Sequence, residues 1–358
     1  MSTSTLKCAE AIGPVPTGRR NLVLPLGSAR WLLDVRSLLV GSGLAAAAIL
    51  LALVSLGLGD VKVPFNQVLA ALVGAAEPKY QLVVIDWRLT RALLALVFGF
   101  ALGISGALFQ SLTRNPLGSP DVIGFNTGAY TGALALMFYT AATPLQLAAG
   151  SITSGLLTAL LVFVLASRNG TTGFRLIVVG IGVGAMLASL NTYMLIVAER
   201  QIALAAAVWG AGSLNSVGND VVGGSLAVIM VLALAALALQ HRARILECGD
   251  RFACSLGVNA RRVRLGMVVT GVGLVAVPAA AAGPIAFVAL AAPQISKRLT
   301  RRDELDLLPA GAMGALMLVA ADTIARTAFG QIQLPVGVVT VSIGGIYLIW
   351  LLIREARR

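Results

Sequence analysis

The sequence RNPLGSPD, residues 114–121, lies between two long uncharged apolar stretches and breaks the helix that comes before it. Pro116 and Pro120 each remove a backbone N–H donor, and they move Asn115 and Ser119 out of helical geometry. In a membrane such irregular backbone is tolerated only where protein or water covers it. The segment therefore predicts a break between two membrane-spanning helices.

The composition excludes a soluble protein. Hydrophobic residues make up 58% of the 358 positions and charged residues 12%, and the mean hydropathy is +0.90. That leaves too few polar side chains to cover a globular surface of this size. The net charge of +12 does not indicate nucleic acid as a partner, because the cytoplasmic loops of membrane proteins collect Lys and Arg. We therefore expect a polytopic membrane protein.

The apolar stretches are long enough for about ten membrane crossings, each of which needs roughly 20 residues. The stretch 122–167 is broken around Pro144 and is interpreted as two spans joined by a short turn. The stretch 265–296 has basic residues on both flanks, so we expect it to cross and return, with its turn near Gly283 and Pro284. The other predicted spans are residues 38–58, 92–112, 176–198, 221–240, 307–326 and 336–353.

This arrangement predicts an all-α protein whose two termini are both cytoplasmic. It places 21 of the 27 Lys and Arg residues on the cytoplasmic side, as the positive-inside rule requires. Residues 1–36 carry five of these basic residues and no signal-peptide core, so we expect a cytoplasmic tail. Residues 37–358 are expected to form one transmembrane domain.

The sequence also restricts how such a protein is driven. It has no Gly-Lys dipeptide, and therefore no phosphate-binding loop for ATP. Carriers coupled to protons or sodium usually bury a carboxylate near the middle of the membrane. The only acidic residue in a predicted span is Asp322, near the outer end, where Arg326 can pair with it. One histidine, His241, and three scattered cysteines offer neither a metal site nor catalytic machinery. An ion-coupled carrier and an enzyme are both disfavoured.

The longest cytoplasmic loop predicted between spans is HRARILECGDRFACSLGVNARRVR, residues 241–264. Its apolar side chains are interspersed with arginines, and Gly249 and Gly257 interrupt the pattern, which fits two short amphipathic helices with a turn between them. An ordinary basic loop would carry the same charge. The other interpretation is a docking surface for a separate cytoplasmic ATPase, which would supply the energy that this chain lacks.

Five stretches resemble one family of transport proteins. They are residues 88–130, which include the opening motif, and residues 174–185, 256–258, 282–299 and 333–352. These stretches are similar to the permease subunits of bacterial type II ABC importers for ferric siderophores and cobalamin. LGSPDVIGFNTGAY and QLPVGVVTVSIGGIYLI are most similar to the ferric-enterobactin branch. The resemblance implies a ten-helix permease in the bacterial inner membrane, which works with a second permease, two ATPases and a siderophore-binding protein.

The resemblance also implies roles for individual residues. Three arginines on the outer face, Arg88, Arg91 and Arg326, would pair with carboxylates of the binding protein. Interface anchoring of the membrane helix is the other interpretation for Arg88 and Arg91. A cytoplasmic gate would consist of two loops. Its residues are Asn115, Pro116 and Leu117 in the first loop and Thr171, Thr172, Gly173 and Phe174 in the second.

Further residues are implied for ATPase coupling and for the passage. The coupling residues are Leu256, Gly257, Val258, Arg261 and Arg262. The passage would be lined by helices that contain Gly180, Gly182, Gly184, Gly344 and Gly345. Small residues there would make room for a bulky ligand, but close helix packing explains them equally well, and it is the favoured explanation for the GxxxG step at Gly99 and Gly103. The resemblance implies no metal and no cofactor in this chain, since ATP and Mg²⁺ would bind the ATPase subunits.

We therefore predict a permease subunit that carries a ferric siderophore, of the enterobactin-like catecholate type or a related one, from its binding protein into the cytoplasm. Cobalamin or haem is the alternative cargo, and an ion-coupled secondary carrier is the less favoured mechanism. The enterobactin-like branch implies a heterodimer of two homologous permeases rather than a homodimer. No bond chemistry is expected in this chain.

Overall fold

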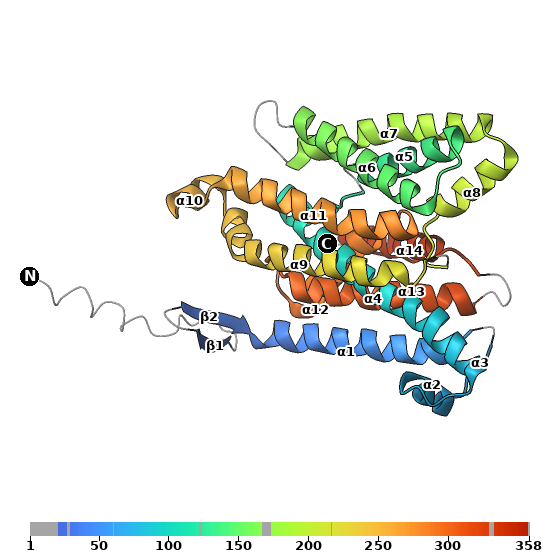
Figure 1. Cartoon of the computed structure of the whole chain (residues 1–358). Coiled ribbons are helices and arrows are strands. Elements are labelled where there is room, and N and C mark those ends of the chain that lie inside the picture. The colour runs from blue at the N-terminus through green and yellow to red at the C-terminus, as the bar shows by residue number, and fades with distance from the viewer. Residues whose placement is uncertain are drawn as a thin grey trace, which may run out of the picture.

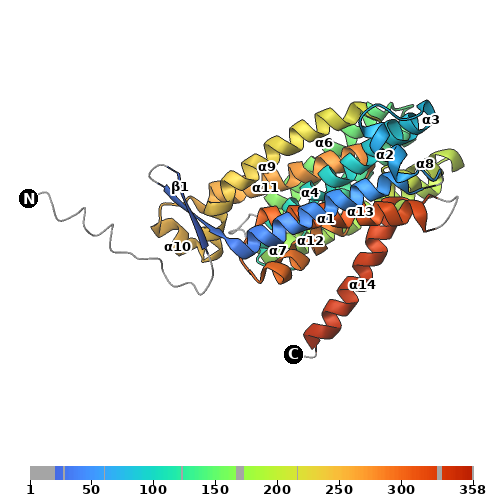
Figure 2. The ribbon, with the colours of Figure 1, turned by 90° about the horizontal axis from the view of Figure 1, so that it is seen from below.

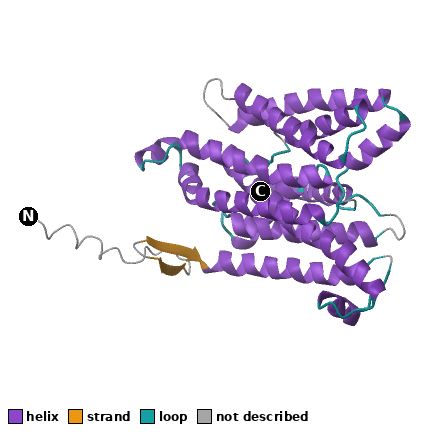
Figure 3. Ribbon diagram, viewed as in Figure 1, coloured by secondary structure: helices purple, strands orange, loops and turns teal. Residues whose placement is uncertain are grey.

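The structure is a computed structural model of the chain, and it describes residues 21–26, 29–59, 61–121, 124–166, 173–215, 217–328 and 333–356. Helices form nearly all of this part of the chain (Figures 1 and 3). The elements are β1 (Asn21–Leu26), β2 (Ala29–Asp34), α1 (Val35–Gly57), α2 (Phe65–Leu72), α3 (Pro78–Gln81), η1 (Leu82–Leu89), α4 (Thr90–Thr113), α5 (Phe125–Tyr139), α6 (Pro144–Ala166), α7 (Gly173–Val197), α8 (Arg200–Gly210), α9 (Asp220–Glu247), α10 (Asp250–Ser255), α11 (Ala260–Ala282), α12 (Val288–Thr300), α13 (Leu307–Thr327) and α14 (Val336–Ala356). The segment η1 is a π-helix.

Seven helical segments of the described chain are long and apolar enough to cross a membrane. They are α1, the continuous segment Pro78–Thr113 that ends with α4, and α6, α7, α9, α11 and α13. One shorter apolar helix among the described residues is Val336–Tyr347, which is part of α14. Two further helices are short, since α5 has 15 residues and α12 has 13. Each predicted span falls on one of these helices, and the predicted helical membrane fold is confirmed.

Some predicted boundaries differ from the structure. The helix expected to begin at residue 92 begins at Pro78, because the mostly apolar segment Leu82–Leu89 continues into α4 without a break. The loop expected at residues 241–264 is shorter, since α9 extends beyond its start and α11 begins before its end. One short helix, α10, lies between them in place of the two expected ones.

The core is built around α4, which packs along α13 and also contacts α11 and α12 (Figure 2). Two glycines of α4 allow it to approach the backbone of α13 closely. A Cβ added to Gly99 would lie 2.4 Å from the carbonyl oxygen of Gly314, and one added to Gly103 would lie 2.2 Å from that of Ala310. Helix association in lipid depends on such small residues. The packing role predicted for this GxxxG step is confirmed.

The long helices run alongside one another, so the bundle has two ends (Figure 1). One end carries α10, β1 and β2, and it exposes arginines that include Arg261, Arg262 and Arg301; we call it the basic end. The other carries α2, α3 and α8, and we call it the opposite end. The strands β1 and β2 form an antiparallel hairpin in which Asn21 pairs with Asp34. The sequence analysis had expected no strand in this region.

The helices α7 and α14 expose much of their apolar surface. In α7 the side chains of Ile181, Met186, Tyr193 and Ile196 are 60%, 74%, 64% and 77% exposed, and in α14 that of Ile346 is 70% exposed. Figure 2 shows α14 leaving the bundle at an angle. Exposed apolar patches of this kind require lipid or another protein around them. These two helices also carry the five predicted passage glycines.

Candidate functional site

At the opposite end, the side chain of Arg88 is folded into the protein. It is 8% exposed, and its Nη1 and Nη2 donate hydrogen bonds to the carbonyl oxygens of Leu56, at 2.7 Å, and Val61, at 2.5 Å. Leu56 lies in the last turn of α1, where carbonyl groups have no partner within the helix. Arg88 therefore caps α1 and fixes the connection that follows it.

Arg91, Asp322 and Arg326 form a buried charge cluster at the same end. Nε of Arg91 lies 2.7 Å from Oδ1 of Asp322, and Nε of Arg326 lies 3.1 Å from Oδ2. The pairing of Asp322 with Arg326 was predicted, whereas Arg91 comes from a different helix. Arg91 also donates to the side chains of Asn215 and, over 3.4 Å, Gln333. Two cations share one carboxylate, so one positive charge is left over.

The three arginines were expected to contact a binding protein, and that role stays a prediction. They are 8%, 8% and 7% exposed, so most of each side chain is enclosed. Nη2 of Arg91 is buried and has no hydrogen-bond partner among the described residues. Exposed cationic side chains at this end include Lys62, Lys79 and Arg200. The sequence showed which charges lie at this end, but it could not separate the buried from the exposed ones.

The first predicted gate loop begins where α4 ends, at the basic end. Arg114 ends the helix in a left-handed conformation with φ of 50°. The backbone N–H of Leu117 donates to the side-chain oxygen of Asn115 over 2.9 Å, which closes a turn. Pro116 is exposed, and Leu117 is 46% exposed. The predicted break in the helix is confirmed, and these residues form its surface turn.

The second predicted gate loop can be followed only in part. Thr171 and Thr172 lie outside the described residues. Gly173 is the first residue of α7, and Phe174 follows it in the first turn. The gate role of this loop, and that of residues 115–117, stays a prediction.

Beyond the exposed turn, the chain runs back into the protein. Ser119 is 3% exposed, and both of its neighbours are buried. Gly124 lies against the first half of α7, because a Cβ added to it would be 3.6 Å from the carbonyl oxygen of Gly180 and from Cα of Gly184. The helix α5 therefore starts inside the bundle, which is consistent with its length of only 15 residues. The sequence analysis had not predicted this inward path.

Asp121 joins the inward segment to the turn before α12. Its carboxylate accepts a hydrogen bond from the side chain of Asn126, and it lies near the backbone N–H of Phe287. Phe287 has φ of 73° and ψ of −34°, and the N–H of Val288 donates to the carbonyl oxygen of Ala286 over 3.0 Å. This is the rare γ-turn with positive φ, which costs a residue other than glycine about 1–3 kcal/mol. The sequence analysis assigned no role to Asp121 or Phe287.

The predicted passage glycines differ in their surroundings. Gly344 is tightly packed, since a Cβ there would lie 1.8 Å from Cδ1 of Phe287. Gly182 and Gly345 have no heavy atom of the described chain within 4 Å of an added Cβ, and Gly184 has one contact at 3.9 Å. Close packing therefore accounts for Gly344, whereas its neighbour adjoins open space. The role of these glycines in a passage stays a prediction.

The predicted coupling residues form an exposed corner at the basic end. Leu256 ends α10 and is 56% exposed, and Val258 is half-buried behind it. Gly257 has φ of 76°, and this conformation turns the chain toward α11. Arg261 and Arg262 are exposed in the first turn of that helix. An exposed apolar side chain flanked by arginines suits a protein contact, and the coupling role itself stays a prediction.

Two acidic residues hold this corner to the end of α4. Glu247 accepts a hydrogen bond from Ser111 over 2.6 Å. Asp250 pairs with Arg264 at 2.6 Å and more loosely with Arg114 at 3.4 Å. Ion pairs at the surface contribute only up to about 1 kcal/mol each, so these contacts orient α10 more than they stabilise the fold. The signal that the sequence analysis missed is that they are the only acids in an otherwise basic loop.

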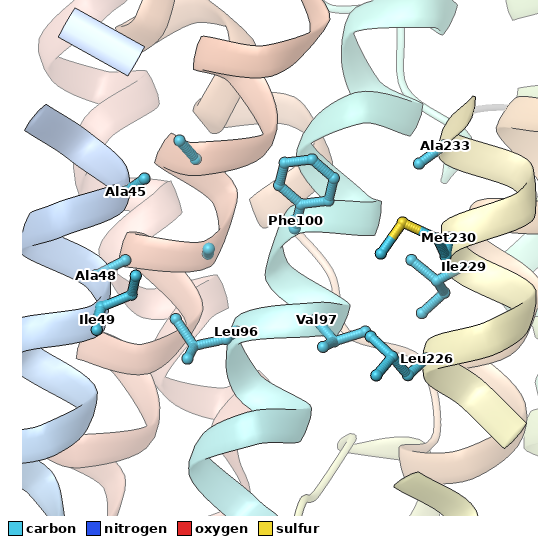
Figure 4. A pocket seen from close by; sticks show the side chains of 12 residues that line it. Ala45, Ala48, Ile49, Leu96, Val97, Phe100, Leu226, Ile229, Met230 and Ala233 are labelled. Carbon is cyan, nitrogen blue, oxygen red and sulfur yellow. The ribbon is translucent and has the colours of Figure 1, made fainter. Parts of the chain in front are cut away.

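An apolar groove lies away from these residues, between α1, α4, α9 and α13 (Figure 4). Its volume is about 250 Å³, and Phe100 and Met230 are its largest side chains. The residues that line it are all apolar. A groove of this kind suits a hydrocarbon chain and not a charged iron complex, so it is not part of the candidate transport site.

The helix arrangement matches that of a solved transporter. The structure is described as an inward-facing conformation of a metal-chelate type ABC transporter. It aligns with a TM-score of 0.78 at 25% sequence identity, covering 88% of this chain and 99% of that chain. With this match, and with seven candidate membrane spans and one shorter apolar helix among the described residues, the chain falls in the class of ABC transporter permeases. It belongs to the FecCD transport family, whose family model matches residues 44–354.

Curated relatives cover most of the chain. The ferric enterobactin transport system permease protein FepG of Escherichia coli (strain K12) is 48% identical over 315 residues, which are 88% of this chain and 96% of that protein. The iron(3+)-hydroxamate import system permease protein FhuG of Bacillus subtilis (strain 168) is 32% identical, covering 84% of this chain and 92% of that protein. The hemin transport system permease protein HmuU of Yersinia pestis is 30% identical, covering 75% and 82%.

Proposed function

We propose that this chain is the permease subunit of an ATP-driven importer that carries a ferric siderophore of the enterobactin-like catecholate type from a binding protein into the cytoplasm. The observation that carries the proposal is the 48% identity to the ferric enterobactin permease over 88% of the chain. Relatives named for hydroxamate, citrate and haemin are 30–32% identical. A related ferric siderophore is the nearest alternative cargo, and haem or cobalamin is a more distant one.

The ATPase is a separate subunit in this proposal. The chain has no phosphate-binding loop, so ATP and Mg²⁺ bind to two partner ATPases. The described residues include no group of three or more His, Cys, Asp and Glu that could hold a metal ion. We assign the ATPase contact to the exposed corner of residues 256–258 with Arg261 and Arg262, because it combines an apolar tip with a basic rim.

The basic end faces the cytoplasm in this proposal, and both termini lie on that side of the bacterial inner membrane. The positive-inside rule supports this orientation. The opposite end then meets the siderophore-binding protein, near Arg88, Arg91 and Arg326. Since these side chains are enclosed, docking on them requires the connections around them to move. A second, homologous permease covers the apolar faces of α7 and α14, as a heterodimer.

Transport in such a machine is a change in the relative stability of two conformations. Movement of α10 on the ATPase reaches α4 through Glu247 and Asp250, which contact its last residues. The first gate loop, residues 115–117, directly follows the end of α4 that this movement shifts. The second gate loop, residues 171–174, is the other part of the proposed gate. The chain supplies binding geometry and differential stability, and it breaks no bond.

Uptake of radiolabelled ferric enterobactin tests the proposed function. Cells without this chain should lose uptake, and cells that regain it on a plasmid should recover. Radiolabelled haemin and cobalamin are measured in parallel. If ferric enterobactin uptake is unchanged while haemin or cobalamin uptake is lost, the siderophore assignment is wrong. Uptake that survives loss of every partner ATPase but stops with an uncoupler would instead establish an ion-coupled carrier.

A further inference from the structure

Three residues without an assigned role in gating meet at one place inside the bundle. Asp121 ends the buried segment after the surface turn, Phe287 precedes α12, and Gly344 belongs to α14. The backbone N–H of Phe287 lies near the carboxylate of Asp121, and its ring lies against Gly344. The contact therefore links the segment that follows α4 to two other helices of the bundle.

The ring of Phe287 occupies a notch in α14 that only glycine provides. A Cβ on Gly344 would lie 1.8 Å from Cδ1 and 2.2 Å from Cγ of the ring, well inside any real contact distance. The next residue, Gly345, has no heavy atom of the described chain within 4 Å of an added Cβ. The half-buried ring thus lies at the border between packed helices and open space.

The backbone of Phe287 is held in a conformation that phenylalanine does not favour. It has φ of 73°, its N–H lies near the carboxylate of Asp121, and Asn126 donates a hydrogen bond to the same carboxylate. Strain of this kind persists only where the surroundings over-determine it, and it clusters at clamps and switch regions. Oδ1 of Asn126 is buried with no hydrogen-bond partner in the described structure, so this arrangement leaves an acceptor that another conformation is free to satisfy.

We propose that Phe287 is a gate side chain of the passage and that Asp121 positions it. In the closed arrangement, the ring rests in the notch of Gly344, and Asp121 holds the turn that presents it. Opening shifts α12 relative to α14, withdraws the ring and releases the strained backbone. This inference rests on the proposed function, because it takes the open space beside α7 and α14 as the passage.

Two glycines give contrasting variants for a transport test. Gly344→Ala places a methyl group where the ring lies, and Gly43→Ala, on α1 and away from the passage, places one in open space. In cells with the complete transporter and equal amounts of it in the membrane, Gly344→Ala should lower uptake of radiolabelled ferric enterobactin on the order of tenfold, because overpacking shifts the two-state balance. Gly43→Ala should stay within about twofold of wild type. Equal losses in both variants would overturn the assignment of the notch.

A second-site variant separates loss of the gate from damage to α14. Phe287→Ala removes the ring, so the combination with Gly344→Ala no longer has a collision. The double variant should regain the uptake of Phe287→Ala alone. A double variant as inactive as Gly344→Ala would show that the ring is not the cause, and the proposal would fall.

The positioning role of Asp121 can be tested without a siderophore, by measuring how accessible the passage is to a labelling reagent. A cysteine replaces Gly182 in a variant whose native cysteines are removed, and an impermeant maleimide labels it in right-side-out and inverted vesicles. Phe287→Ala should raise the labelling rate about tenfold in the orientation that is protected in wild type, which corresponds to a shift of about 1.4 kcal/mol in the closed state. Asp121→Asn should act in the same direction, and combining both changes should add nothing.

Two outcomes of the labelling experiment would overturn the proposal. An unchanged labelling rate in Phe287→Ala would show that Phe287 is not a gate side chain. Additive effects of Asp121→Asn and Phe287→Ala would show that Asp121 does not act by positioning Phe287. Since no siderophore is used, these outcomes are independent of the cargo. Wild-type protein that fails to take up ferric enterobactin refutes the proposed function instead, and the labelling result still stands.

Discussion

Replacing Asp322 by asparagine removes the only carboxylate that Arg91 and Arg326 share in the described structure. The two ion pairs are 2.7 Å and 3.1 Å long, and Asp322 is only 2% exposed, so water cannot take over its role. Asparagine keeps the size and one acceptor oxygen, but it leaves two enclosed cations without a counter-charge. Breaking a buried pair in this way costs about 3–5 kcal/mol. The expected fall in melting temperature is on the order of 10 °C.

The assay is thermal unfolding of the purified permease in detergent, followed by loss of the monodisperse fraction. Asp303→Asn is the matched control, because this aspartate is exposed, and its effect should be within about 0.5 kcal/mol. Adding Arg326→Gln to Asp322→Asn should recover part of the loss, since one of the unpaired cations is gone. If the melting temperature of Asp322→Asn equals that of wild type, this cluster does not stabilise the packing of α4 on α13.

Three other variants test separate parts of the structure. Gly103→Ala should lower the free energy of unfolding by about 1–3 kcal/mol, because its Cβ would lie 2.2 Å from the carbonyl oxygen of Ala310; Gly43→Ala, in open space on α1, should not lower it in the same melting assay. Leu256→Asp should leave the melting temperature unchanged and weaken co-purification of the ATPase, and undiminished co-purification would contradict the coupling surface. Asp250→Ala should reduce the iron taken up per ATP hydrolysed without lowering stability, since its ion pairs are half-exposed; an unchanged ratio would exclude it from coupling.

The sequence predicts much of the fold because the membrane restricts the possible structures. Lipid requires long apolar helices, and Lys and Arg mark the cytoplasmic ends, so the spans and the turn at Gly283 could be located by counting. The segment Leu82–Leu89 was not expected to be helical, because its two charges resemble those of a loop. The strands β1 and β2 were missed because residues 1–36 were interpreted as a cytoplasmic tail from their basic residues and their lack of a signal-peptide core.

Contacts between side chains that are far apart in the sequence could not be predicted from the sequence. The pair of Asp322 and Arg326 follows from helical spacing, and it was found. Arg91 pairs with the same carboxylate although it is 231 residues away in the sequence. Only the packing of α4 on α13 brings these two residues together. The position of Asp121 could not be predicted for the same reason. Hydropathy shows that the helix ends before this segment, but it does not show that the segment runs back into the protein. The arginines that resemble a docking motif are consequently buried in contacts of their own in this conformation.

The exposure of α7 supports the proposal that two permeases share the passage. Only 17% of its membrane-spanning window is buried within the protein, against 78% for the segment that ends with α4. A helix that lined a passage enclosed by this chain alone would have neighbours on its other side, and α7 has open space at Gly182. Gly345 of α14 adjoins open space in the same way. In the proposed heterodimer, the second permease supplies the remaining wall of a passage along these two helices, and Phe287 lies where the packed side of this chain meets that proposed space.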